Sequence, residues 1–206
     1  MDYTTLLKKL EGIQTIGSVM DLLKVNKSKA IYCIYRLRKL GYVKTKRLSN
    51  NKRVYNLSFE NRLKGTSYYE IINQYSPIKI ATPIVHKIYG KIPSLEETLI
   101  YAVKTKSIRV ILAALVLFKR ICNWKLLYHL AKENSIERQV GALYDLARTV
   151  MKVKKMDKRF RNNALPQKEY NFEYLIPGFK SHDFNNIEEV WKIYLPFNKN
   201  DLEEYT

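Results

Sequence analysis

Seven side chains suited to bind phosphates or base edges lie between positions 27 and 39 of the 206-residue chain. Lysine, arginine, serine and tyrosine donate hydrogen bonds to phosphate oxygens, and arginine also pairs with guanine. No acidic residue occurs from Lys24 to Phe59, whereas a solvated helix surface ordinarily mixes both signs. The pattern predicts a nucleic-acid-binding helix that carries Lys27, Ser28, Lys29, Tyr32, Tyr35, Arg36 and Lys39.

A second group of polar and basic side chains follows in a predicted β-hairpin. Alternating residues favour short strands over Tyr42–Leu48 and Arg53–Leu57, with a polar turn at Ser49–Lys52. On a hairpin beside a DNA-binding helix, such side chains are expected to contact the flanking backbone or the minor groove. They are Lys46, Arg47, Asn50, Asn51, Lys52 and Arg53.

The net charge of +18 is unevenly distributed, with +9 on residues 1–60 and +6 on residues 101–150. A further cluster of cations lies at positions 148–161. Such a run fits a solvated surface as well as a second binding surface, and both interpretations stay open. The cluster consists of Arg148, Lys152, Lys154, Lys155, Lys158, Arg159 and Arg161.

Three short helices are expected to position the first group. Leu6, Leu7 and Leu10 predict the first helix. Thr15 is a suitable N-cap for the second, and Asn26 caps the third after a turn of only a few residues, which is the spacing of a helix-turn-helix. The third helix should end at Gly41 and bury Ala30, Ile34, Leu37 and Leu40.

This order of elements resembles the winged-helix transcriptional regulators. In that family a Val-x-x-Leu helix, a capped turn and a recognition helix ending in Leu-x-x-Leu-Gly-Tyr-Val recur. The resemblance implies double-stranded DNA as partner, with the third helix in the major groove and the hairpin as the wing. Winged helices also bind RNA or other proteins, and these alternatives stay open. The matching residues are Val19, Leu22, Asn26, Leu37, Leu40, Gly41, Tyr42 and Val43.

The sequence predicts a mainly α fold with a small β component (α+β), in which a winged-helix domain over 1–60 precedes a helical C-terminal domain over 94–206. Residues 61–93 are predicted to form a junction with a linker helix near Tyr68–Tyr75 and an extended segment at 78–85. Helix caps are expected at Ser94, Ser107, Asn123 and Asn134, with capping boxes at Ser94–Glu97 and Asn134–Glu137. Short strands or extended segments are expected at Tyr170–Ile176 and Trp191–Phe197.

The C-terminal part is similar in order to AbiEi-type antitoxins. The segments that carry this resemblance are Ile80–Pro83, Trp124–Ala131 and Arg138–Leu143. It implies a transcriptional regulator that represses its own operon and counteracts a nucleotidyltransferase-like toxin as its protein partner. The chain departs from the family pattern where residues 84–93 separate Pro83 from the acidic pair Glu96 and Glu97. A module that only binds a toxin or another protein is the alternative.

Catalysis is not expected, and no cofactor or metal is predicted. His86, His129 and His182 are too far apart for a metal-binding motif, and no glycine-rich phosphate loop or nucleophile elbow occurs. Ser181–Asp183 spells Ser-His-Asp, but consecutive side chains cannot stack as a catalytic triad does. Asp145 is predicted to pair with Arg148 within one helix.

A cytoplasmic location is expected. Cys33 and Cys122 lie in apolar patterns, which predicts reduced core residues rather than a disulfide framework. The longest apolar run, Val110–Phe118, is too short to cross a bilayer and is predicted to form part of a core helix. The N-terminus lacks the pattern of a signal peptide. Gly141 in a predicted helix indicates close helix packing.

Overall fold

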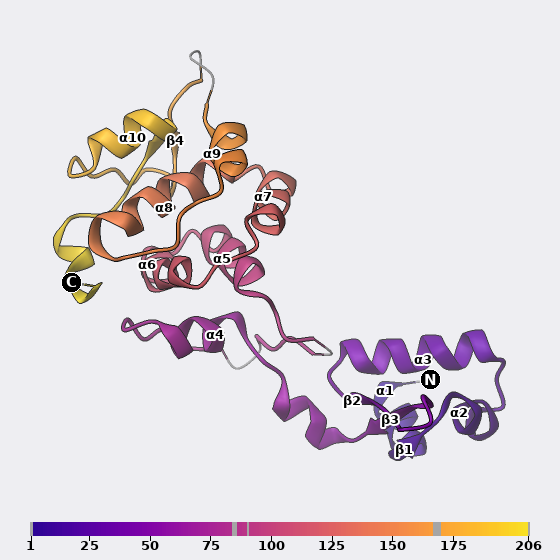
Figure 1. Ribbon diagram of the computed structural model, residues 1–206. Helices are drawn as coiled ribbons and strands as arrows, with labels where there is room; N and C mark the ends of the chain where they lie inside the picture. Colours follow the sequence, from indigo (N-terminus) through magenta and orange to yellow (C-terminus); the bar gives the residue numbers. More distant parts are fainter. Residues whose placement is uncertain (1, 84–85, 90, 167–169, 206) are drawn as a thin grey trace. The chain divides into compact units, whose positions relative to one another are not determined.

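The computed structural model describes residues 2–83, 86–89, 91–166 and 170–205 (Figure 1). The chain is mainly helical, with a small antiparallel sheet near the N-terminus, as predicted. It divides into two compact units. The first unit is Met1–Ser67 with Pro83–Ile92, and the second is Tyr68–Thr82 with Pro93–Thr206. The segment 61–93, predicted as a junction, therefore contributes to both units.

The first unit begins with three helices whose caps follow the sequence signals. The side chain of Thr15 accepts a hydrogen bond from the backbone N of Ser18 (3.1 Å), and Asn26 Oδ1 accepts one from the backbone N of Lys29 (2.9 Å). Both predicted N-caps are confirmed. The elements are α1 (Tyr3–Leu10), β1 (Gly12–Gln14), α2 (Ile16–Leu23), α3 (Lys27–Lys39), β2 (Val43–Arg47), β3 (Arg53–Leu57) and the 3-10 helix η1 (Phe59–Lys64).

The predicted hairpin is present as β2 and β3, and a third strand joins it. The strand order is β1-β3-β2, all antiparallel, with Gly12 opposite Leu57 and Val43 opposite the same residue on the other side. The sequence pattern did not predict β1, because a three-residue strand is too short to show alternation. β1 leaves Ile13 73% exposed while its backbone covers one edge of β3.

The core of the first unit is small. It consists of Leu6, Leu7, Leu10, Val19, Ala30, Ile34, Leu37, Val43, Tyr55 and Leu57. The prediction that Leu40 is buried is wrong, since its side chain is 38% exposed. After Ala30, Ile34 and Leu37 the helical period returns to the buried face at position 41, so Leu40 lies at the edge of that face.

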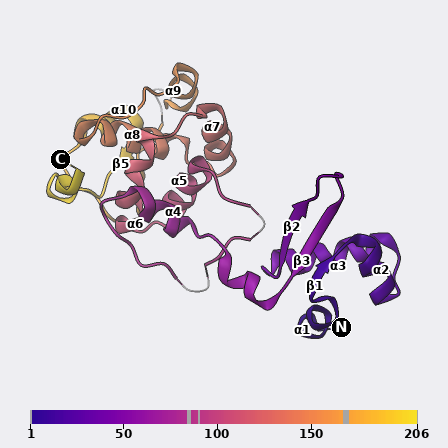
Figure 2. The same cartoon turned by 60° about the horizontal axis from the view of Figure 1, so that its bottom comes forward.

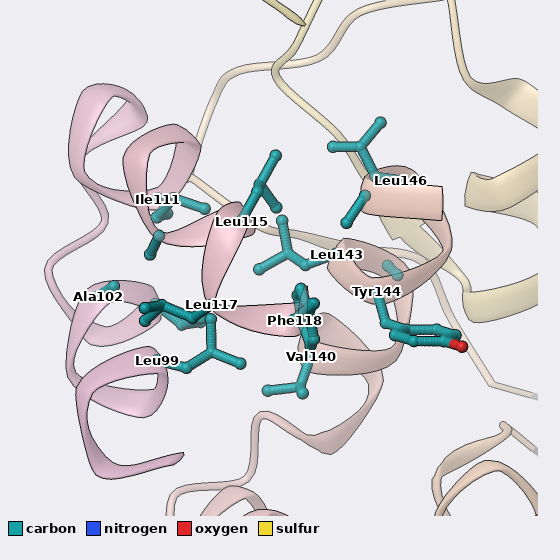
Figure 3. Packing of buried hydrophobic residues seen from close by; sticks show 14 of the residues in the cluster. Leu99, Ala102, Ile111, Leu115, Leu117, Phe118, Val140, Leu143, Tyr144 and Leu146 are labelled. Atoms are coloured by element: carbon teal, nitrogen blue, oxygen red, sulfur yellow. The ribbon is translucent and has the colours of Figure 1, made fainter. Parts of the chain in front are cut away.

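The second unit is helical around one large core. Its helices are α4 (Tyr68–Tyr75), α5 (Leu95–Lys104), α6 (Ile108–Ala114), the 3-10 helix η2 (Leu115–Lys119), α7 (Trp124–Glu133), α8 (Glu137–Val150), α9 (Lys158–Ala164), α10 (Asn185–Trp191) and the 3-10 helix η3 (Asn200–Tyr205). Leu99 and Ala102 of α5, Phe118 of η2 and Leu143 of α8 belong to this core (Figure 3). The predicted core helix over 108–118 tightens into a 3-10 helix after Ala114.

Two of the four caps predicted in this unit are confirmed. Ser94 and Glu97 form the expected capping box, and Asn123 Oδ1 accepts from the backbone N of Leu126 (2.9 Å). Ser107 precedes α6 without a side-chain capping bond. The predicted capping box at Asn134–Glu137 is wrong. Ser135 has a left-handed backbone (φ +53°), and Ile136 N donates a hydrogen bond to Ala131 O (3.0 Å). Residues 134–136 therefore form the C-terminal cap of α7 rather than the N-terminal capping box of α8.

The aromatic segments near the C-terminus form less strand than predicted. They contribute one parallel pair of two-residue strands, β4 (Glu173–Tyr174) and β5 (Ile193–Tyr194). The predicted extended segment Trp191–Phe197 begins too early, because Trp191 is the last residue of helix α10. The predicted extended segment at 78–85 forms no strand over its described residues, and its positions 84–85 lie outside them.

Trp191 of α10 packs its ring against Gly141 of α8. Its ring lies so close to Gly141 that a Cβ there would overlap the indole, and its Nε1 donates to Asp145 Oδ2 (2.7 Å). Asp145 also accepts from Arg161 at 3.1 Å, so the prediction that it pairs with Arg148 is corrected. The prediction of close packing at Gly141 is confirmed.

We expect Gly141→Ala to destabilise the second unit, because the added methyl group forces Trp191 out of its site. Overpacking of this kind costs about 1–3 kcal/mol, equivalent to a fall in Tm of roughly 2–4 °C per kcal/mol for a chain of this size. Thermal unfolding followed by circular dichroism measures it. Gly17→Ala is the control, because a Cβ at Gly17 meets only Thr15 Oγ1 at 3.7 Å. Equal Tm values for the two variants would contradict the prediction.

Candidate nucleic-acid interface

Helix α3 presents the first predicted group of side chains to solvent. Its inner face packs Ala30, Ile34 and Leu37 into the core of the first unit. The remaining positions are exposed because of the helical period, except for the half-buried Cys33 and Arg38. All seven predicted residues are exposed: Lys27, Ser28, Lys29, Tyr32, Tyr35, Arg36 and Lys39.

Tyrosine rings hold several of these cations in place. The guanidinium of Arg36 lies 4.6 Å from the ring centre of Tyr3 and 5.7 Å from that of Tyr32. The ammonium of Lys39 lies 4.9 Å from the ring centre of Tyr35. A cation–π contact orders a cation without neutralising it, so these positive charges remain available to an anionic partner.

The β2–β3 hairpin presents the second group. The turn is closed by bonds from Leu48 N to Lys52 O (2.9 Å) and from Lys52 N to Asn50 Oδ1 (3.1 Å), and Asn51 has a left-handed backbone (φ +62°). Figure 2 shows the hairpin extending from the helices of this unit with its turn at the free end. All six predicted residues are exposed: Lys46, Arg47, Asn50, Asn51, Lys52 and Arg53.

Two arginines face each other across the hairpin. Arg47 is the register partner of Arg53, next to the turn. Like charges directly opposite each other on neighbouring strands are destabilising. Within the described part of the chain, no acidic side chain forms an ion pair with any Lys or Arg between Lys24 and Phe59. The first unit thus carries a strongly positive surface that it does not neutralise itself.

The structure adds Lys44 to this surface, and it shows a further exposed cation of the first unit, Arg62, that the sequence pattern did not single out. Lys44 is exposed and lies two residues before Lys46 on β2, which places both on the same face of the strand. The strand alternation predicts this position once the hairpin is assigned. Arg62 donates to the hydroxyl of Tyr42 (3.2 Å), and hydrogen bonds with Tyr42 and Tyr89 raise the pKa of its guanidinium.

A half-open cavity of about 420 Å³ lies beside α3 in the first unit. Tyr3, Leu6, Leu23, Val25, Lys29, Tyr32, Cys33 and Arg36 line it. The prediction that both cysteines are core residues is wrong for Cys122, whereas Cys33 packs against the core of the first unit without being fully buried. Cys33 is half-buried in the cavity wall, Cys122 is exposed, and both are free thiols.

The third predicted group belongs to the second unit. Arg148, Lys152, Lys154, Lys155, Lys158 and Arg159 are exposed, whereas Arg161 is half-buried and paired with Asp145. Arg161 also lies over the ring of Trp191, with its guanidinium 5.3 Å from the ring centre. It therefore serves the internal packing of this unit and is removed from the exposed cluster.

Ser181 and Asp183 of the Ser-His-Asp run have structural partners. Ser181 Oγ donates to Asn198 Oδ1 (2.8 Å), and Asp183 Oδ2 accepts from the backbone N of Lys199 (2.8 Å). Both contacts fasten the C-terminal loop. Among the described residues, no group of three or more His, Cys, Asp or Glu is arranged to hold a metal ion.

Comparison with protein-family models, with curated proteins and with solved structures finds no match to this chain. Over the described residues, none of the helices combines the length and apolar character required to cross a membrane. The candidate interface therefore rests on the geometry and charge of the first unit alone.

We expect Arg53→Glu to stabilise the first unit, because it replaces a cross-strand like-charge pair with an ion pair to Arg47. Such pairs contribute roughly 0.2–1 kcal/mol, and added salt should reduce the gain. Urea unfolding at low and high salt measures the effect. Lys44→Glu is the matched control, since it makes the same change in net charge opposite the uncharged Asn56. The same change in unfolding free energy for both variants would show that the Arg47–Arg53 pair has no specific role.

Proposed function

We propose that the first unit is a winged helix that binds double-stranded DNA, with α3 in the major groove and the β2–β3 hairpin against the flanking backbone or minor groove. The observation that carries this proposal is the surface of α3 and the hairpin, where ten Lys and Arg residues from Lys27 to Arg53 have no acidic neighbour in sequence. A partner rich in phosphate relieves their mutual repulsion.

The shape of this surface favours duplex DNA. A helix fits the major groove, which is about 12 Å wide, and helix-turn-helix proteins read bases with the N-terminal residues of the second helix of the motif. In this chain those residues are Lys27, Ser28 and Lys29, which follow the turn after α2. Arg36, about two turns further along, has the bidentate geometry that pairs with guanine.

Sequence-specific transcriptional regulation is the form of DNA binding that we propose. Ile31 is exposed on α3 between the cations. A surface that only neutralised phosphates would need no such apolar side chain, whereas thymine methyl groups in the major groove offer it apolar contacts. We place this activity in a reducing compartment, the cytoplasm, because Cys33 and Cys122 are unpaired.

An AbiEi-like antitoxin is the more specific form of the proposal, and the order of segments in the second unit supports it. Two residues of the resembling helix have internal partners: Arg138 binds Glu173, and Gly141 accommodates Trp191. A toxin-binding site would therefore have to use other residues of that unit. RNA binding by the first unit is the alternative for the nucleic-acid partner.

We expect Lys29→Ala combined with Arg36→Ala to weaken binding to the operator. The loss should be about 1–3 kcal/mol for each base contact, or roughly tenfold per 1.4 kcal/mol. Fluorescence anisotropy with the DNA upstream of the gene measures it, with structured RNA as competitor. Lys8→Ala combined with Lys9→Ala is the control, because it removes the same charge from exposed positions of α1.

Unchanged affinity of the Lys29/Arg36 variant would contradict the placement of α3 at the DNA. Arg53→Glu supplies an independent check, since a variant that is more stable yet binds DNA more weakly cannot owe its defect to misfolding. Preferential displacement of the DNA by structured RNA would favour the alternative partner.

The antitoxin form predicts a stable complex with the product of the adjacent reading frame. Co-expression of both chains with a tag on this one should recover the neighbour at equal stoichiometry. The Lys29/Arg36 variant is the control, because its toxin binding should be intact while its DNA binding is weakened. Failure to recover the neighbour would contradict the antitoxin role and leave the DNA-binding proposal unaffected.

A further inference from the structure

The segment between α8 and α9 is held in a fixed shape by one buried tyrosine. Tyr144 is 2% exposed, its hydroxyl donates to the backbone O of Lys154 (3.1 Å), and it accepts from the backbone N of Met156 (2.8 Å). Met151 and Met156 are buried on either side. The lysines of this irregular segment, Lys152, Lys154 and Lys155, are consequently directed to solvent from an anchored backbone.

The beginning of α7, with its cation Lys125, lies next to this segment and α9. Lys154 Nζ lies 2.7 Å from the sulfur of Cys122, two residues before α7 begins at Trp124. Lys125 and Arg159 line one cavity of about 240 Å³ together with Tyr128. Residues far apart in sequence thus form one basic surface, which we call the α7–α9 face. It comprises Lys125, Lys152, Lys154, Lys155, Lys158 and Arg159.

The acidic side chains near this face bind other groups, although Asp157, which lines the cavity with Lys125 and Arg159, keeps its negative charge. Asp145 is bound by Arg161 and Trp191. The carboxylate of Asp157 accepts from the backbone N of Arg159 (2.6 Å) as the N-cap of α9. Among the described residues, no ion pair involves a cation of the α7–α9 face.

Among the described residues, no exposed large apolar side chain accompanies the six cations of the α7–α9 face. Aromatic rings line the cavity beside Lys125 and Arg159, but Trp124 and Phe160 are buried there and Tyr128 is half-buried. The large apolar side chains that are exposed in the second unit belong to other segments. They are Tyr170, Tyr174, Phe179 and Val190. Protein interfaces centre on apolar and aromatic residues, and membrane-surface helices insert them. An exposed set of lysines and one arginine without such a centre matches a phosphate backbone.

We propose that the α7–α9 face is a second nucleic-acid contact, which binds backbone phosphates without reading sequence. The identity of the polyanion as duplex DNA rests on the proposed function of the first unit. A chain with two attachment surfaces gains affinity because binding at one raises the effective concentration at the other. The α7–α9 face thus adds affinity on any sequence, while α3 supplies discrimination.

The test compares two double variants of the full chain. Lys125→Ala with Lys155→Ala removes two cations of the face, and Lys180→Ala with Lys199→Ala removes two exposed cations elsewhere in the second unit. Affinity for an operator duplex and a scrambled duplex is measured over a series of salt concentrations. The first variant should bind both duplexes more weakly, with a log–log salt slope flatter by about 0.9 for each lost phosphate contact. The control pair should retain the wild-type slope.

Equal slopes for the two pairs would overturn the second contact, and the proposed function would stand if the Lys29/Arg36 variant still loses affinity. A wild-type chain that binds no duplex would instead overturn the proposed function. Structured RNA then replaces the duplex as probe for the same two pairs. Equal slopes on RNA would overturn the α7–α9 face as a phosphate-binding surface, and a flatter slope for the Lys125/Lys155 variant alone would support it.

Discussion

Repulsion between like charges is the constraint on which the first unit depends. Ten buried side chains must hold together a surface on which the cations of α3 and the hairpin form no ion pair with any described residue. The pairing of Arg47 with Arg53 shows that this repulsion is tolerated even between adjacent strands. Tyrosine contacts order the cations without neutralising them, so the positive charge is kept for a partner.

In the second unit, by contrast, a charged side chain beside the core is paired with an opposite charge. Asp145 lies between Trp191 and Arg161, and a half-buried ion pair with an extra hydrogen bond fixes how α8, α9 and α10 pack. Tyr144 on the same helix binds the backbone of the segment that follows. The position of each exposed lysine in that segment therefore depends on α8. Packing and surface charge are linked by two neighbouring residues of one helix.

The sequence was sufficient to predict features that depend on a few neighbouring residues. The caps at Thr15, Asn26 and Ser94, the exposed face of α3 and the hairpin were all visible in the local pattern. Features that need a distant partner were missed. β1 exists because β3 offers it an edge, and Asp145 bonds with Arg161 across sixteen positions rather than with Arg148 on its own helix. Ser135 could not be assigned locally, because the end of α7 and the start of α8 compete for it.

The position of Tyr89 limits how recombination could transfer the first unit to another protein. Tyr89 packs against Gly41 and Gly65, where any Cβ would overlap its ring, although it follows them after the chain has passed through α4 in the second unit. The polypeptide crosses between the units three times, after residues 67, 82 and 92. A single recombination point therefore cannot transfer the first unit intact. Inheritance of the α3 surface requires the segment around Tyr89 to travel with it, which couples the evolution of the two units.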